Sequence, residues 1–345
     1  MNRADFVFSV AELKDYLVKK GIAEKQITAM IESDNHFNLL ISKYYIDLID
    51  WSDEADPLAK MVVTSNLEAD VKEYEMKDPI GDKVHSPVAG IIHRHKDRCL
   101  LMLTNSCAVH CRFCFRKNLL DENRADFDKC IQYIRDHEEI WEVIFSGGDP
   151  FVFSDYFTEL VINKLREIRH VKVLRFHTRT PVVYPARITE NFSEILKKAG
   201  SYSVVLHINH PREITPDFCC AVERMQKSGA MLLSQSVLLN GVNNTVETLS
   251  ILFKRLVEIG VKPYYLHHLD PVAGTDHFRI SVKEGKDLYQ TLQRSISGLA
   301  VPQYVIDVPG GFGKIPVISF IEKKSGVYEA IGRDGIEVTY KDPSI

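Results

Sequence analysis

Long uncharged apolar runs are missing from this chain of 345 residues. No stretch is long enough to cross a bilayer, so we expect no transmembrane span and no membrane partner. The first twenty residues carry an acid at Asp5 and lack the apolar segment of a secretory signal. An excess of one charge is missing as well, because 43 Lys and Arg face 47 Asp and Glu. This balance gives no electrostatic reason to expect a nucleic-acid partner.

Paired cysteines are also lacking. The seven cysteines are an odd number and are spread unevenly, which favours a reducing compartment and predicts a cytoplasmic protein. Four of them show no ligand spacing and are interpreted as ordinary thiols, namely Cys99, Cys130, Cys219 and Cys220.

The spacing of apolar residues along the sequence divides the chain into three regions. Residues 1–85 carry apolar residues at helical spacing over 11–21, 24–33 and 56–65, which predicts an N-terminal helical region. Residues 86–300 alternate short apolar runs with amphipathic segments. Residues 301–345 form a C-terminal segment that includes a glycine-rich stretch and a predicted hairpin built on Arg-Asp-Gly.

The alternation in the middle region predicts parallel strands covered by helices. We therefore expect an α/β fold, a partial (β/α)6 TIM-type barrel with an N-terminal helical segment and a C-terminal extension. The predicted strands lie within 99–106, 142–149, 171–180, 201–210, 230–239 and 262–270. The helices expected between them lie within 128–137, 157–168, 190–200, 217–229 and 245–260.

Polar residues follow each apolar run at the same end. In a β/α barrel the carboxyl ends of the strands form the active-site face. Strands that simply stop at polar loops would explain some of these residues, but not cysteines, a Gly-Gly-Asp turn and histidines together. We therefore expect the site to draw on the polar residues at these ends, which are Cys107, Gly147, Gly148, Asp149, Thr178, Arg179, His207, Asn209, His210, Gln235, Ser236, His267, His268 and Asp270.

Three cysteines, Cys107, Cys111 and Cys114, follow a C-x3-C-x2-C spacing. Thiolates suit soft metals and iron–sulfur clusters. Three cysteines on a [4Fe–4S] cluster would leave one iron open to a small molecule. The alternative is a structural zinc ion held by the three cysteines and His110, in a binding module without catalysis.

The spacing, with Phe113 before the last cysteine, resembles that of the radical S-adenosylmethionine superfamily. The resemblance implies that the open iron chelates S-adenosylmethionine, which is cleaved to a 5′-deoxyadenosyl radical. The sequence Ser146-Gly147-Gly148-Asp149 ends the second predicted strand, where the superfamily keeps a glycine-rich turn for the cofactor. Glycine there lets the backbone approach a ligand closely.

A lysine, Lys314, leaves the glycine-rich loop DVPGGFGK, and lysine can form a Schiff base with pyridoxal phosphate. From about residue 80 to 320 the chain resembles the lysine 2,3-aminomutase family. The motifs that carry this resemblance are CRFCFRK, FSGGDP, TRTPVVYPARIT, HINHPREIT, QSVLLNGVNN, PYYLHHLDPVAGTDHFR and DVPGGFGKIPV.

The resemblance implies a role for each matching residue. Lys314 would bind pyridoxal 5′-phosphate, and Arg94 would lie near its phosphate. Arg116 would bind the substrate carboxylate, a task that suits a planar guanidinium. Asp270 and Asp307 would hold the distal ammonium of lysine. The positions that the resemblance places around S-adenosylmethionine are Ser146, Gly147, Gly148, Asp149, His207 and Gln235.

The implied activity is L-lysine 2,3-aminomutation, an isomerase reaction that moves the α-amino group to the β-carbon. Alternatives are the short branch that makes (R)-β-lysine for elongation factor P, and related mutases of arginine or glutamate. No cysteine follows Cys220, which puts the C-terminal zinc site of longer relatives in doubt. The expected partners are the amino acid, a reductant such as flavodoxin or ferredoxin, and, as an open case, a second copy of the chain.

Overall fold

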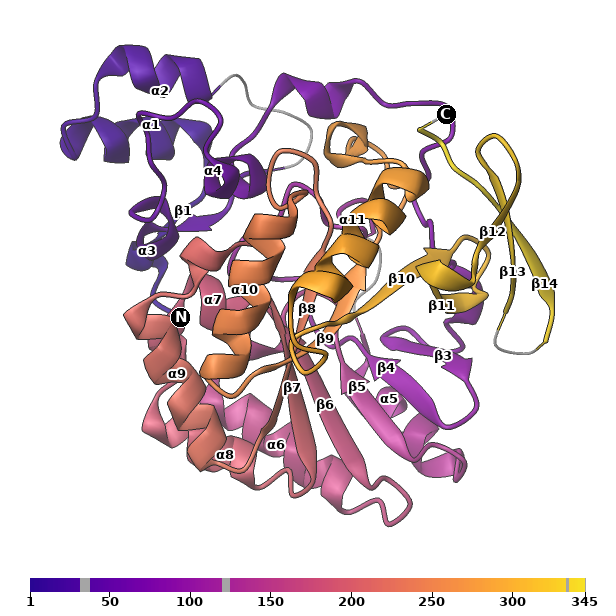
Figure 1. Ribbon diagram of the computed structural model, residues 1–345. Helices are drawn as coiled ribbons and strands as arrows, with labels where there is room; N and C mark the ends of the chain where they lie inside the picture. Colours follow the sequence, from indigo (N-terminus) through magenta and orange to yellow (C-terminus); the bar gives the residue numbers. More distant parts are fainter. Residues whose placement is uncertain (32–37, 120–124, 333–334, 345) are drawn as a thin grey trace.

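The computed structural model describes residues 1–31, 38–119, 125–332 and 335–344, and is built around one curled nine-stranded sheet (Figure 1). The strand order is β11-β10-β9-β8-β7-β6-β5-β4-β3, so strands that are neighbours in the sheet are also consecutive in the chain. Strands β4 to β10 run parallel, and β3 and β11 add antiparallel edges. The bounds are β3 Ile91–His95, β4 Arg98–Leu101, β5 Glu142–Phe145, β6 Val173–Thr178, β7 Tyr202–His207, β8 Met231–Val237, β9 Lys262–His267, β10 Gln303–Val308 and β11 Gly313–Pro316.

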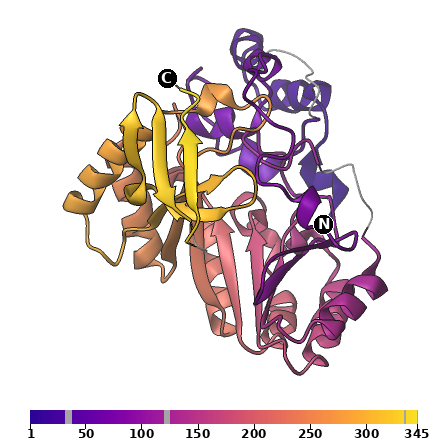
Figure 2. The same cartoon turned by 90° about the vertical axis from the view of Figure 1, so that its right-hand side faces the viewer.

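Helices cover the outer face of this sheet, as Figure 2 shows most clearly. They are α5 Phe127–Asp136, α6 Asp155–Arg166, α8 Glu190–Lys197, α9 Pro216–Lys227, α10 Val246–Glu258 and α11 Val282–Ser295. Each begins directly after a Ser, Thr or Asp whose side chain accepts a hydrogen bond from a backbone N–H of the first turn. In α10, Leu249, Leu252, Phe253 and Leu256 form the buried stripe expected of a helix that packs on a sheet.

The predicted strand–helix alternation is confirmed, since each of the six apolar runs contains one strand and each expected helix is present. The sheet nevertheless continues past residue 300. Strand β10 pairs in parallel with β9, and β11 turns back against β10. The sheet itself therefore crosses the boundary expected at residue 300. The sequence patterns predict no strand in this glycine-rich segment, although the apolar run Tyr304–Ile306 lies in β10 and is buried.

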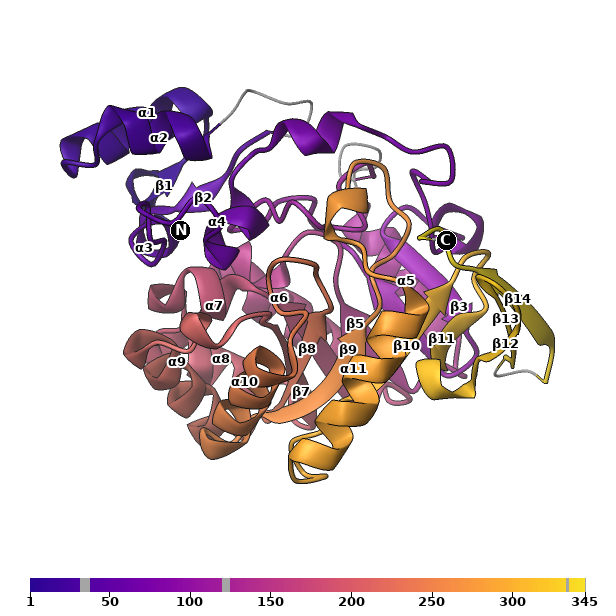
Figure 3. The ribbon, with the colours of Figure 1, turned by 45° about the horizontal axis from the view of Figure 1, so that its top comes forward.

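The two edges of the sheet lie close together, because the sheet curls. A Cβ at Gly313 on β11 would lie 3.5 Å from the ring of His95 on β3. A Cβ at Gly311 would lie only 2.6 Å from the ring of His85, in the short helix η3, Lys83–His85. In Figures 1 and 3, β11 is accordingly seen beside β3.

The N-terminal region lies over the end of the barrel where the parallel strands finish (Figure 3). It contains α1 Val10–Lys19, α2 Glu24–Met30, α3 Lys43–Ile46 and α4 Pro57–Val62, with β1 Phe6–Val7 paired to β2 Ile41–Ser42. The three predicted helical stretches are confirmed as α1, α2 and α4, although residues 32 and 33 of the second lie outside the described residues.

A small antiparallel sheet completes the fold beside β11. It consists of β12 Ile321–Lys324, β13 Val327–Ile331 and β14 Glu337–Lys341. The hairpin of β13 and β14 is the predicted one, and Arg333 and Asp334 of its turn lie outside the described residues. In the part of the chain that the structure describes, no helix is both long and apolar enough to span a membrane.

Candidate active site

The cysteine loop leaves the carboxyl end of β4 and is anchored to the N-terminal region. The backbone N–H of His110 donates to the carbonyl of Leu40, and that of Arg112 donates to the carbonyl of Met61. Arg112 is fully buried, and its guanidinium donates two hydrogen bonds, of 2.8 and 2.6 Å, to the carboxylate of Glu68. The segment before β3 therefore fixes the loop from the outside.

The three cysteines are free thiols whose burial raises the pKa of each. The pKa of Cys114 rises to about 11. Within the described ranges, no three His, Cys, Asp or Glu side chains are arranged around a single metal ion. His110, the alternative fourth zinc ligand, directs Nδ1 to the carbonyl of Asn38 at 2.7 Å. The three cysteine sulfurs alone are the donor set that fits a cluster with an open iron.

The Gly147-Gly148 turn packs directly on the chain that leads to Cys107. A Cβ at Gly148 would lie 2.2 Å from the carbonyl oxygen of Ser106. Gly147 has a φ of 106°, a conformation that favours glycine. This turn therefore needs both glycines to let two backbones approach each other at the end of β5.

Asp149, predicted to contact a cofactor, is engaged within the protein. One carboxylate oxygen accepts from the hydroxyl of Thr178 at 2.6 Å and from the backbone N–H of Phe151 at 3.0 Å. The other accepts from the backbone N–H groups of Arg179 and Thr180, at 2.8 and 2.9 Å. The carboxylate therefore joins the Gly-Gly-Asp turn to the end of β6, and we infer that it positions the turn.

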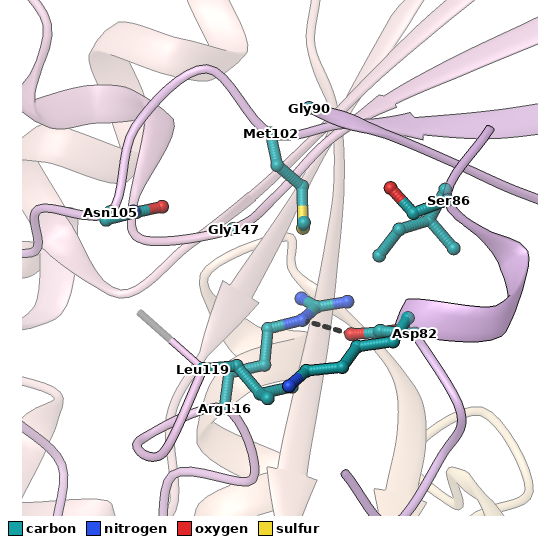
Figure 4. A pocket seen from close by; sticks show the side chains of 10 residues that line it. Asp82, Ser86, Gly90, Met102, Asn105, Arg116, Leu119 and Gly147 are labelled. Carbon is teal, nitrogen blue, oxygen red and sulfur yellow. Dashed lines mark hydrogen bonds and ion pairs between the residues drawn. The ribbon is translucent and has the colours of Figure 1, made fainter. Parts of the chain in front are cut away.

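Arg116 and Arg94 meet at one buried carboxylate, Asp82. Nε of Arg116 lies 2.7 Å from one oxygen of Asp82, and Nη2 of Arg94 lies 3.5 Å from the other. Nη1 of Arg116 donates to the hydroxyl of Ser146 at 2.9 Å. Figure 4 shows Arg116 and Asp82, which line a cavity together with Gly90, Met102, Asn105 and Gly147.

Lys314 and Asp307 lie opposite each other in the antiparallel register of β10 and β11. Nζ of Lys314 is 2.6 Å from an oxygen of Asp307. Burial opposes ionisation of Asp307, but the charge of Lys314, with smaller help from His267 and Arg94, keeps its pKa below the ordinary value. At Asp270, just beyond β9, burial and the charge of Asp307 raise the pKa to about 7.

Three of the parallel strands, β6, β7 and β9, each carry a histidine near the carboxyl end. His177 on β6, His207 on β7 and His267 on β9 each have a buried Nε2 with no hydrogen-bond partner among the described residues. Burial lowers the pKa of His207 and of His267 to about 3, so both rings are neutral near pH 7. Gln235 on β8 is the register partner of His207. Unpartnered buried nitrogens are rare in proteins, so an ordered water or a polar ligand is expected to satisfy these three.

Several site residues were missed by sequence reasoning. Asp82 lies in a polar stretch without regular periodicity, so its position between two arginines could not be foreseen. Glu213 falls inside the quoted motif HINHPREIT and was not singled out, whereas Arg179 was expected at the end of the third apolar run without a partner or a role. The structure places Arg179 beside Cys111 and Glu213.

The sequence profile described as the Radical SAM superfamily matches residues 101–230, from the last residue of β4 to the residue before β8. This match defines the class of protein to which the curled sheet and the cysteine loop belong. Full-length relatives are more specific. An L-lysine 2,3-aminomutase of Clostridium subterminale is 37% identical over 342 residues, which cover 97% of this chain and 82% of that protein.

Two further relatives are also 2,3-aminomutases. An L-lysine 2,3-aminomutase of Haemophilus influenzae is 39% identical, covering 88% of this chain and 91% of that protein. A glutamate 2,3-aminomutase of Clostridioides difficile is 36% identical, covering 86% and 71%. The chain therefore belongs to the lysine 2,3-aminomutase family of radical S-adenosylmethionine enzymes. It is an isomerase that acts on an amino acid, and the alternative of a zinc-stabilised binding module is wrong.

Proposed function

We propose that this enzyme is an L-lysine 2,3-aminomutase, which moves the α-amino group of lysine to the β-carbon. The observation that carries the proposal is the contact of 2.6 Å between the ammonium of Lys314 and Asp307, with Asp270 close by. Two carboxylates that share a site favour a cation between them. The terminal ammonium of lysine suits this pair, whereas the terminal carboxylate of glutamate would be repelled.

Arg116 is proposed to bind the substrate α-carboxylate. Its side chain is almost fully buried, and the bonds to Asp82 and Ser146 fix the plane of the guanidinium. A fixed planar fork pairs with a carboxylate through two parallel hydrogen bonds. With Arg116 at one end and Asp270 and Asp307 at the other, the site would hold an extended lysine by both of its charged ends.

The residues fit the three cofactors that the family uses. When bound, the [4Fe–4S] cluster and S-adenosylmethionine supply the hydrogen-abstracting radical, and pyridoxal 5′-phosphate supplies the ring that delocalises the unpaired electron. Cys107, Cys111 and Cys114 would hold the cluster. Lys314 would hold pyridoxal phosphate, with Arg94 near its phosphate. Around S-adenosylmethionine we place the turn formed by Ser146, Gly147, Gly148 and Asp149, together with His207 and Gln235.

Asp307 has a second task in this scheme. Its carboxylate pairs with the ammonium of Lys314 in the protein alone, and once Lys314 holds pyridoxal phosphate the carboxylate would be free for the terminal ammonium of lysine. The segment around Asp82 and the N-terminal helices lie over this end of the barrel and would exclude water from a reactive radical.

Product analysis tests the proposal. The protein is reconstituted anaerobically with iron, sulfide and pyridoxal phosphate, and then receives S-adenosylmethionine, dithionite and one of lysine, arginine or glutamate. Chiral chromatography should detect β-lysine from lysine and no β-isomer from the other two. Turnover of arginine or glutamate without turnover of lysine would overturn the substrate assignment.

Borohydride trapping tests the cofactor residue separately. Reduction followed by peptide mapping should give a pyridoxyl adduct on Lys314 in the parent protein and none in Lys314→Ala. Lys324→Ala, on β12, is the matched control and should keep the adduct. An unmodified Lys314 in protein that retains pyridoxal phosphate would remove its assigned role.

We also propose that the enzyme works in the cytoplasm with a flavodoxin- or ferredoxin-type reductant, and that it forms a homo-oligomer. All seven cysteines are free, which suits a reducing compartment. Exposed isoleucines gather near and on the small C-terminal sheet, at Ile318, Ile321, Ile331 and Ile336. Sedimentation velocity of the reconstituted protein should show an oligomer, and a monomer at every concentration would contradict this part of the proposal.

A further inference from the structure

A buried guanidinium lies against one of the cluster cysteines. Arg179 follows β6 directly, is 5% exposed, and points Nη1 at the sulfur of Cys111, 3.4 Å away. The ring of Phe113 lies 5.2 Å from the guanidinium carbon and shields it. Nε of Arg179 is buried and has no hydrogen-bond partner among the described residues. The proposed lysine chemistry gives this arginine no task.

A single carboxylate balances the charge of Arg179. Nη2 of Arg179 is 2.8 Å from Glu213, whose side chain is completely buried. Glu213 is itself fixed by four donors. One oxygen accepts from Arg179 and from the hydroxyl of Tyr45, and the other accepts from the backbone N–H groups of Asn209 and His210. The pair therefore has one geometry, built from α3, the end of β6 and the segment after β7.

An ion pair kept only for stability does not need a free donor directed at sulfur. Replacement of a buried pair by apolar residues often costs nothing, because desolvation offsets the attraction between the charges. Here Nη1 of Arg179 donates to a cysteine sulfur, and Nε is buried without a partner among the described residues. That arrangement is expected of a group that acts on the contents of the cysteine loop.

We propose that Arg179 is a positioning residue that sets the reduction potential of the iron–sulfur cluster through its hydrogen bond to Cys111, and that Glu213 limits how much of the arginine charge the cluster feels. The inference rests on the proposed cluster at Cys107, Cys111 and Cys114. Reduction adds one negative charge to the cluster. A cationic hydrogen-bond donor at a ligand sulfur favours the reduced form, and a carboxylate beside that donor opposes it.

The test is a reductive titration of the cluster, followed by electron paramagnetic resonance in the absence of substrate. Arg179→Gln leaves Glu213 unbalanced and should lower the midpoint potential. We expect about a tenfold lower ratio of reduced to oxidised cluster at a fixed potential, which is about 59 mV for one electron. Glu213→Gln leaves Arg179 unbalanced and should raise the midpoint. The double variant should fall between the two.

The opposite signs separate this role from a structural one. Both single variants break the same buried pair, so a purely structural effect would act in the same direction in both. Arg179→Lys keeps the charge and should recover part of the shift. The matched control is Arg175 on β6 with Glu142 on β5, another largely buried pair at 2.7 Å. Arg175→Gln and Glu142→Gln should leave the midpoint unchanged.

Equal midpoints, or shifts of one sign in both single variants, would overturn the proposal. If Arg179→Gln loses its iron, the proposal is tested by Glu213→Gln alone. An unchanged or lowered midpoint potential in Glu213→Gln would then overturn it. The iron content of the parent protein distinguishes failure of the proposed function from failure of the role of Arg179. A parent that never assembles a cluster refutes the proposed function, whereas a parent with a cluster but no antisymmetric shift refutes only the role of Arg179. Because no substrate is present, an error in the choice of lysine leaves this test valid.

Discussion

Asp307 and Lys314 are held opposite each other by backbone pairing, with 2.6 Å between the carboxylate and the ammonium. The turn between them contains Gly310 and Gly311, both with positive φ, which allows β11 to fold back at once. The contact therefore depends on strand register, and any shift in the hairpin would move both residues at the same time.

Loss of the Asp307 carboxylate should weaken substrate binding. In Asp307→Asn we expect kcat/KM for lysine to fall by about 10- to 100-fold, since hydrogen bonds to charged groups contribute about 1.5–3 kcal/mol. Anaerobic steady-state kinetics measure this change. Asp287→Asn, in an exposed pair on α11, is the control and should behave like the parent. Equal kcat/KM in the two variants would contradict an ammonium site at Asp307.

Asp270 should make the enzyme pH dependent. Burial and the charge of Asp307 raise its pKa to about 7. Because lysine binds to the carboxylate form, kcat/KM should rise as the pH passes through about 7. Asp270→Asn should lose this rise, and a rise that persists in the variant would remove Asp270 from the ammonium site.

The same shift predicts a change in stability of the ligand-free protein. Between about 4 and about 7 the folded state keeps a proton on Asp270 that the unfolded state has released. This residue's contribution to stability is therefore largest at low pH and falls as the pH rises through that range. Thermal melts should show Asp270→Asn gaining relative to the parent from pH 4 to pH 7, whereas parallel curves would argue against a raised pKa.

Arg116→Lys should separate recognition of carboxylate from cofactor binding. The introduced lysine side chain keeps the positive charge of Arg116 but lacks the planar guanidinium that Asp82 and Ser146 hold. We expect a rise of at least about tenfold in KM for lysine, in line with the loss of one charge-assisted hydrogen bond. Iron content and pyridoxal phosphate content should stay at the parent level. A normal KM would show that the substrate carboxylate binds elsewhere.

Gly148→Ala should disturb the cysteine loop. The new methyl group would lie 2.2 Å from the carbonyl oxygen of Ser106, a backbone atom that cannot turn aside. We expect less than half of the parent's iron after reconstitution, assayed colorimetrically, because displacement of Ser106 moves Cys107. Gly298→Ala is the matched control, since no atom lies within 4 Å of its new methyl group. Normal iron content in Gly148→Ala would show that the turn can relax.

The local signals in the sequence were enough to predict the barrel. Apolar runs, helix caps and the cysteine spacing are set by neighbours in the chain, and the six strands and the loop at Cys107 appeared where expected. The pair Lys314 and Asp307 could be named, but their contact depends on a strand, β10, that the glycine-rich context concealed.

The contacts of Asp82 and Arg179 could not be predicted, because their partners come from distant parts of the chain. Asp82 meets arginines 12 and 34 residues away, and Arg179 meets a tyrosine 134 residues away. No periodicity records such contacts. Asp149 is the opposite case, a residue that a motif predicted to contact a ligand. In the structure its carboxylate accepts four hydrogen bonds from backbone and side-chain groups of the protein.

The meeting of β3 and β11 has a consequence for how the enzyme is made. The cysteine loop follows β4 early in the chain, while Lys314 lies on the last strand of the curled sheet. During synthesis, the cysteine loop leaves the ribosome about two hundred residues before Lys314, and chains begin to fold from the N-terminus as they emerge. We therefore expect the contact between His95 and Gly313 to form after the other strands of the curled sheet have paired, and a chain truncated before residue 313 would retain the cysteine loop but lack Lys314.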